Sequence, residues 1–89
     1  MNAEKIFVSL IVPKAIGKSG DVWVPMDSCV LEVIKSQKDS AGIEKILFNG
    51  DEFNKFALVY LNGQRIKDPK TPLTFSRNTI EVVVPMAGG

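Results

Sequence analysis

The residues with the clearest chemical potential are the last two of the sequence, Gly88 and Gly89. A terminal glycine pair presents one α-carboxylate on a thread without side chains, and it can adopt backbone angles closed to other residues. Such a thread can enter a channel too narrow for a side chain, where a second protein can act on the carboxylate. We therefore expect the reactive group to be the carboxyl of Gly89. The alternative is an ordinary terminus, where small residues are common.

The rest of the chain holds few residues that catalyse reactions or bind metals. Its 89 residues include no histidine and one cysteine. Histidine is the commonest metal ligand and catalytic base, and one thiolate cannot build a cysteine-ligated metal site. Gly17-Lys18-Ser19 is similar to the end of a phosphate-binding loop, but Val12 stands where that motif needs its first glycine. The sequence thus predicts no metal, no bound cofactor and no catalysis by this chain alone.

Charge and hydropathy restrict the partners and the location. The net charge is +1, which produces too weak an electrostatic field to predict a nucleic-acid or membrane-surface partner. No apolar run approaches the ~18 residues of a membrane span, and the start lacks the features of a leader peptide. A single cysteine forms no internal disulfide, which fits a reducing compartment. We expect a cytoplasmic protein of one domain.

Apolar alternation and turn residues predict the strands. Strand-like segments are expected at residues 5–12, 21–24, 56–61 and 79–84, with a short strand at 64–66. The first two should form a hairpin, and Asn62-Gly63 is a strong signal for a second hairpin turn.

A helix is expected between the second and third strands. Asp27 or Ser28 can cap its start, Gly42 is the predicted stop, and residues 43–47 suggest one more helical turn. If the first strand pairs parallel with the last, this helix is a right-handed crossover packed on one sheet face. The predicted fold class is therefore α+β, a β-grasp with a mixed sheet and one main crossover helix.

The alternation also predicts two different sheet faces. The side chains expected to face the helix are those of Ile6, Val8, Leu10, Val59, Ile80, Val82 and Val84. Phe7, Tyr60 and Val83 then point the other way and form a candidate partner-binding patch. Loops at 48–56 and 67–75, through Phe48, Phe53 or Phe75, could instead cover this face, and the sequence leaves both possibilities open. Trp23 is predicted to be a packing residue.

Proline sets the predicted boundary between the domain and its tail. Pro85 cannot donate to a sheet ladder and disfavours helix before it, so the last strand should stop there. We expect a β-grasp domain at residues 1–84 and a flexible tail at 85–89, in which Pro85, Met86, Ala87 and Gly88 thread Gly89 toward a partner. Five extended residues reach ~16 Å.

These segments resemble the ubiquitin-like sulfur carriers, the group that includes the small subunit of molybdopterin synthase and the thiamine sulfur carrier (MoaD/ThiS). The resemblance is carried by the strand that leads into Asn62-Gly63, by Thr71-Pro72-Leu73, and above all by the Pro-x-Ala-Gly-Gly ending. It spans nearly the whole chain. One departure is Ser76-Arg77-Asn78 before the last strand, where the family usually has a Gly-Asp turn. Asn can supply the same left-handed geometry.

The resemblance implies a carrier rather than an enzyme, although such a chain can be the small subunit of a synthase complex. An E1-like adenylating enzyme would use ATP to activate the carboxylate of Gly89. A sulfur donor would then convert it to a thiocarboxylate, and a downstream acceptor such as a molybdopterin synthase large subunit would take the sulfur. The extended loop between the helix and the third strand modestly favours the molybdopterin group.

Three other functions remain compatible with the sequence. The chain could carry sulfur for thiamine, amino-acid or tRNA thiolation with the same tail. The activated Gly89 could instead acylate lysines of target proteins, as a ubiquitin-like modifier does. The chain could also be a non-catalytic β-grasp binding module, for which Gly88 and Gly89 would be dispensable.

Overall fold

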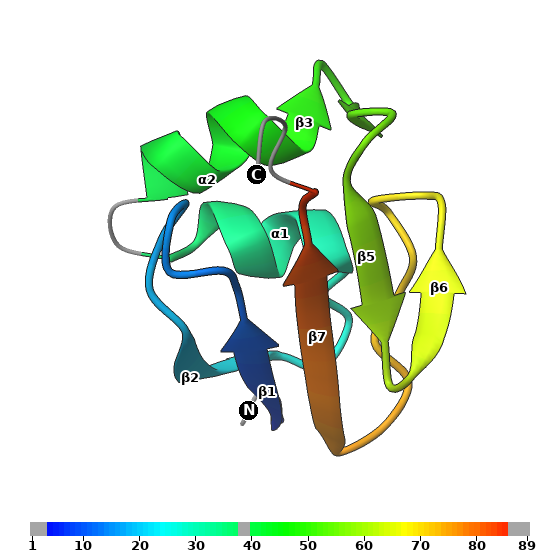
Figure 1. The fold of residues 1–89 in the computed structure, drawn as a ribbon. Coiled ribbons are helices and arrows are strands. Elements are labelled where there is room, and N and C mark those ends of the chain that lie inside the picture. Colours follow the sequence, from blue (N-terminus) through cyan, green and yellow to red (C-terminus); the bar gives the residue numbers. More distant parts are fainter. Residues whose placement is uncertain (1–3, 38–39, 86–89) are drawn as a thin grey trace.

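A computed structural model describes residues 4–37 and 40–85, which fold into seven strands and two helices (Figure 1). In chain order these are β1 (Lys5–Ile11), β2 (Gly20–Pro25), α1 (Val30–Lys35), α2 (Ser40–Leu47), β3 (Phe48–Asn49), β4 (Glu52–Phe53), β5 (Leu58–Leu61), β6 (Gln64–Ile66) and β7 (Arg77–Val83). Within these residues, neither helix has the length and apolar character needed to cross a membrane.

The main sheet has five strands in the order β2-β1-β7-β5-β6. β1 pairs antiparallel with β2 and parallel with β7, while β5 is antiparallel to both β6 and β7. The first and last strands therefore lie side by side in the centre, as the β-grasp prediction required (Figure 1). β3 and β4 form a separate two-stranded hairpin.

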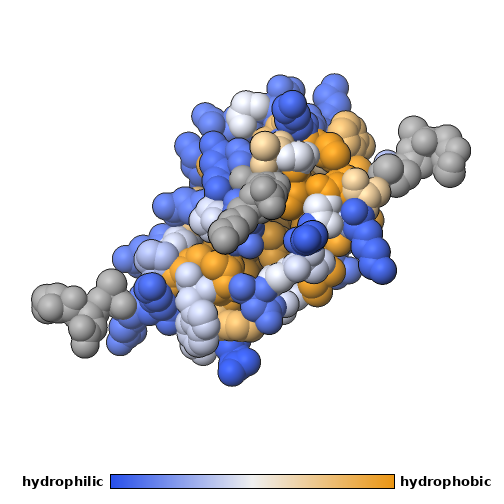
Figure 2. Space-filling view, turned by 90° about the vertical axis from the view of Figure 1, so that its left-hand side faces the viewer, coloured by the Kyte–Doolittle hydropathy of each residue, from blue (hydrophilic) through white to orange (hydrophobic). Residues whose placement is uncertain are grey.

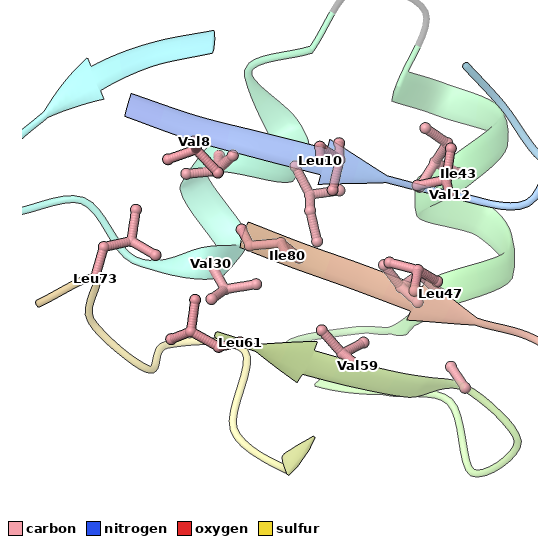
Figure 3. Close-up of a cluster of buried hydrophobic side chains, with 14 of the residues drawn as sticks. Val8, Leu10, Val12, Val30, Ile43, Leu47, Val59, Leu61, Leu73 and Ile80 are labelled. Carbon is pink, nitrogen blue, oxygen red and sulfur yellow. The ribbon is translucent and has the colours of Figure 1, made fainter. Parts of the chain in front are cut away.

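One hydrophobic core lies between the sheet and the helices (Figure 3). All seven side chains predicted to face the helix are buried, which confirms the predicted register. α1 contributes Val30, Val33 and Ile34, each with no exposed surface. Their burial removes them from water and stabilises the short helix, which alone would be too short to persist.

The prediction of one main helix that stops at Gly42 is wrong. Gly42 lies inside α2, and the helical structure instead ends at Lys35 and resumes at Ser40. At the end of α1, Ser36 Oγ and Gln37 Nε2 both donate to the carbonyl of Val33 at 2.7 and 3.1 Å. These side chains satisfy a carbonyl that a continuing helix would have used. Glycine inside α2 costs about 1 kcal/mol, which the burial of the hydrophobic side chains around it offsets.

The start of α1 also differs from the prediction. Its N-cap is Cys29, not Asp27 or Ser28. The Glu32 carboxylate accepts a hydrogen bond of 2.9 Å from the Cys29 amide, which is half of a capping box. Ser28 is buried, and its amide donates to the Pro25 carbonyl. Because the Ser28 amide is already bonded within the turn before α1, the helix begins after Cys29 rather than after Asp27 or Ser28.

The predicted Asn62-Gly63 hairpin turn is confirmed. Asn62 has a φ of 52° and Gly63 a φ of 85°, the two positive values that a type I′ turn requires. β5 starts at Leu58 rather than Phe56, because residues 54–57 form a turn in which the Ala57 amide donates to the Asn54 carbonyl.

The expectation of a left-handed residue at Asn78 is wrong. Asn62 is the only non-glycine residue with positive φ in the described part of the chain. Asn78 instead lies in β7 with 3% exposure, and it joins three segments. Its Oδ1 accepts from Asn62 Nδ2 at 3.0 Å, and its Nδ2 donates to the Phe75 carbonyl at 2.8 Å. Asn62 Oδ1 in turn accepts from the Thr79 amide at 2.8 Å. These bonds tie the β5–β6 turn to the start of β7.

Candidate functional site

The candidate site begins where the central strand β7 ends. β1 accompanies β7 only as far as the pair Ile11–Glu81, whereas β5 continues to the pair Leu58–Val83. Val84 is still buried, and Pro85 is exposed. The chain thus leaves the domain from the central strand of the sheet, which is paired on both sides up to Glu81 and with β5 alone up to Val83. The predicted tail residues Met86, Ala87, Gly88 and Gly89 lie outside the described residues.

Three side chains of the open sheet face lie around this exit, and we call them the exit rim: Ile11, Tyr60 and Val83. Ile11 and Tyr60 both pair with Glu81, from opposite sides, and Val83 is the next residue of β7 on the same face. Ile11 is 42% exposed and Val83 38%, while Tyr60 is half-buried. The exit rim thus surrounds one exposed carboxylate, that of Glu81. Exposed apolar surface of this kind is suited to contact with a partner protein.

Phe7, the third member of the predicted patch, lies on the same face but at its other end. It pairs with Arg77, six residues before Val83 along β7, which separates the two by ~20 Å. Phe7 contacts Trp23 edge-on with ring centroids 5.3 Å apart, and the Arg77 guanidinium lies 5.4 Å from the Phe7 ring. The predicted patch is therefore two clusters, the exit rim and this aromatic cluster of Phe7, Trp23 and Arg77.

The three phenylalanines that could have covered the open face do not bury these clusters. Phe48 and Phe53 stack on each other at 5.6 Å and pack against the core, and Phe75 is 60% exposed. Trp23 is also 60% exposed, so its predicted packing role is limited to the Phe7 ring. Figure 2, seen from the left-hand side of Figure 1 and so from the β2 edge of the sheet, shows hydrophobic surface between hydrophilic side chains on that side of the domain.

Metal-binding groups and surface hollows are the other kinds of candidate site in the body of the domain. No group of three or more His, Cys, Asp or Glu side chains is placed to hold a metal within residues 4–37 and 40–85. A hollow of about 410 Å³ lies between the β5–β6 turn and the loop at 71–75, and it is lined by apolar and uncharged polar side chains.

The predicted patch left out Ile11, although alternation along residues 5–12 already places it on the face of Phe7, and sequence reasoning missed the role of Trp23 in the open face. A signal for both was present. In an antiparallel hairpin, directly opposite residues share a face. The register that buries Ile6 opposite Val24 also places Trp23 opposite Phe7, and therefore on the open face. Ile11 shares the odd numbering of Phe7 along β1, which puts it on the open face.

Solved structures with the same architecture are known although sequence similarity is low. No family model matches the chain, and no curated protein is similar to it in sequence. SAMP1 from Haloferax volcanii superposes with a TM-score of 0.70 at 14% identity, over 93% of this chain and 99% of that one. A chain of the BexX/CysO complex from Amycolatopsis orientalis gives 0.69 at 22% identity, over 92% and 99%. The chain has the ubiquitin-like β-grasp fold.

A third β-grasp neighbour is a Pyrococcus furiosus protein described as subunit 1 of a molybdopterin converting factor. Its TM-score is 0.64 at 14% identity, over 91% of this chain and 99% of that one. The neighbours are thus of nearly the same length as this chain. At these identities the likeness establishes the ubiquitin-like β-grasp fold, and the function must be argued from the site.

Proposed function

We propose that this protein is a ubiquitin-like sulfur carrier whose Gly89 carboxylate is adenylated and then converted to a thiocarboxylate. The observation that carries the proposal is a Gly-Gly sequence attached to the central, doubly paired strand of a β-grasp sheet. Neighbours named CysO and molybdopterin converting factor support it. The proposal requires that Gly89 carry the free α-carboxylate of the chain.

The chemistry needs a partner because a carboxylate is a poor electrophile. An E1-like adenylating enzyme would join the Gly89 carboxylate to the AMP part of ATP and release pyrophosphate. The terminal sulfur of a persulfide donor would then attack the carbonyl carbon and displace AMP, giving an acyl disulfide. A second thiol would attack the donor's sulfur in that S–S bond, which releases the Gly89 thiocarboxylate and leaves the two thiols joined as a disulfide. The protein's own contribution is recognition by the exit rim and delivery of the carbonyl carbon through Pro85, Met86, Ala87 and Gly88.

For the acceptor, we propose a molybdopterin synthase large subunit, to which this chain would be the small subunit. The molybdopterin converting factor among the structural neighbours supports that choice. Sulfur would then be delivered to a pterin. Release of sulfide from the thiocarboxylate only in the presence of such a large subunit and its pterin substrate would establish the assignment, whereas release to a different thiolation enzyme would replace it.

ATP–pyrophosphate exchange by the cognate activating enzyme tests the first step. We expect exchange with the full chain and none with a chain lacking Gly88 and Gly89. A matched control, Gly20→Ala, changes an exposed glycine with open space around it and should exchange normally. Equal exchange by the truncated chain would refute the role of the tail.

A further inference from the structure

The chain contains two Asn-Gly sequences, Asn49-Gly50 and Asn62-Gly63, each at a hairpin turn. Asn-Gly is the dipeptide in which spontaneous loss of the side-chain amide meets the least steric hindrance, since glycine has no Cβ beside the attacking nitrogen. Asparagine is accordingly counted among the thermolabile residues. The structure places the two asparagines in opposite environments, which makes them unequal as sites of this reaction.

Asn62 is held on both ends of its side-chain amide. Its Oδ1 accepts from the Thr79 amide and its Nδ2 donates to Asn78 Oδ1, at 2.8 and 3.0 Å. Its own amide nitrogen donates to the Thr79 carbonyl. Both side-chain bonds must break before the Gly63 nitrogen can reach the side-chain carbonyl carbon of Asn62.

Asn49 is exposed and lacks this restraint. In the described part of the chain, no hydrogen bond holds its side chain or the amide of Gly50. The hairpin that carries it pairs only two residues from each strand, Phe48 with Phe53 and Asn49 with Glu52. The base of the hairpin is held by Asn54, which donates to the carbonyls of Leu47, Ile46 and Phe48, and by the Phe48–Phe53 stack. Only the Asn49–Glu52 pair and the turn at 50–51 lie beyond these contacts, so this tip opens locally at a small cost compared with global unfolding and can adopt the reactive geometry.

We propose that Asn49 is a site of spontaneous deamidation in the folded protein and that Asn62 is protected. The Gly50 amide nitrogen bonds to Cγ of Asn49, the C–NH2 bond breaks, and ammonia leaves with the proton of the Gly50 amide. The resulting cyclic imide is opened by water at either carbonyl, giving aspartate or isoaspartate. The reaction needs water alone, and it is independent of the proposed sulfur chemistry.

The product alters a defined part of the surface. Asn49 lines a hollow of about 340 Å³ together with Glu52, Lys55 and Phe56. Deamidation adds one negative charge there, next to Asp51 and Glu52. An isoaspartate product also inserts an extra backbone carbon, which is incompatible with the regular Asn49–Glu52 pair and should open the β3–β4 hairpin.

Peptide mapping by mass spectrometry tests the proposal in one sample, because Asn62 is an internal control. The folded protein is aged in mildly alkaline buffer, and the replacement of NH2 by OH is followed at each site. Two hydrogen bonds that must break predict conversion of Asn49 about 10-fold or more faster than that of Asn62. In concentrated guanidinium chloride both sites should convert at similar rates, because the sequence is then the only difference.

Two results would overturn the proposal. One is equal or faster conversion of Asn62 in the folded protein. The other is an unmodified Asn49 over a period in which the denatured chain converts at both sites. An Asn49→Gln variant checks the site, since the longer side chain forms the cyclic imide poorly and should abolish only the signal assigned to residue 49.

Discussion

The buried amide of Asn78 provides the most specific test of the fold. Replacing Asn78 by alanine removes the bond from Asn62 Nδ2 and the bond to the Phe75 carbonyl. Each lost bond costs about 1 kcal/mol, and more where its partner stays buried and unpaired, so we expect a loss of about 2–4 kcal/mol in the free energy of unfolding. In urea, a small domain has a denaturant slope near 1–2 kcal/mol/M, so the midpoint should fall by roughly 2 M.

Equilibrium urea unfolding followed by Trp23 fluorescence or circular dichroism measures this change. Ser76→Ala is the matched control, because its side chain is exposed and such changes stay within about 0.5 kcal/mol. The same Asn78→Ala variant should also speed deamidation of Asn62, which loses one of its two side-chain bonds. An Asn78→Ala midpoint equal to that of Ser76→Ala would refute the reasoning that this amide joins β7 to the β5–β6 turn.

Three further predictions concern packing and the exit rim. Gly17→Ala should lower the free energy of unfolding by about 1–3 kcal/mol, because a Cβ there would lie 2.6 Å from Ile43 Cγ1. Gly20→Ala is the control, since a Cβ at Gly20 meets open space, and equal urea midpoints for the two variants would contradict this. Leu47→Ala should cost about 2–5 kcal/mol in the same assay, because Leu47 has no exposed surface, and a cost below 1 kcal/mol would show that the core collapses around it. Val83→Asp should slow pyrophosphate exchange by about 10-fold or more while Val83→Thr has a smaller effect, both with near-normal urea midpoints; unchanged exchange would remove the exit rim from partner recognition.

The strand architecture could be predicted because its signals are local and mutually consistent. Alternation along residues 6–10 and 80–84 fixes which side chains are buried, and the Asn62-Gly63 pair fixes one turn through its positive φ values. A register error of one residue would have exposed the whole inward set. The β-grasp prediction also required parallel pairing of the first and last strands, and β1 and β7 do pair in this way.

The helix ends and the division of the open face could not be predicted from local signals. The end of α1 depends on Ser36 and Gln37 competing for the Val33 carbonyl, whereas Gly42 is tolerated in α2 because tertiary burial outweighs its propensity. The role of Asn78 depends on Asn62, sixteen residues away. Phe7 lies far from the exit rim because β1 pairs with β7 in a register that places Phe7 opposite Arg77. Side-chain alternation shows which face a residue is on, but it does not determine this register.

The central claim is that the carboxyl of Gly89 carries the sulfur. Fragment-ion mass spectrometry of the C-terminal peptide, after reaction with the activating enzyme, ATP and a persulfide donor, tests it most directly. We predict that one oxygen is replaced by sulfur and that the fragments place this change at Gly89. A reaction in which the enzyme and donor convert a known carrier, but leave Gly89 of this protein unchanged, would contradict the account.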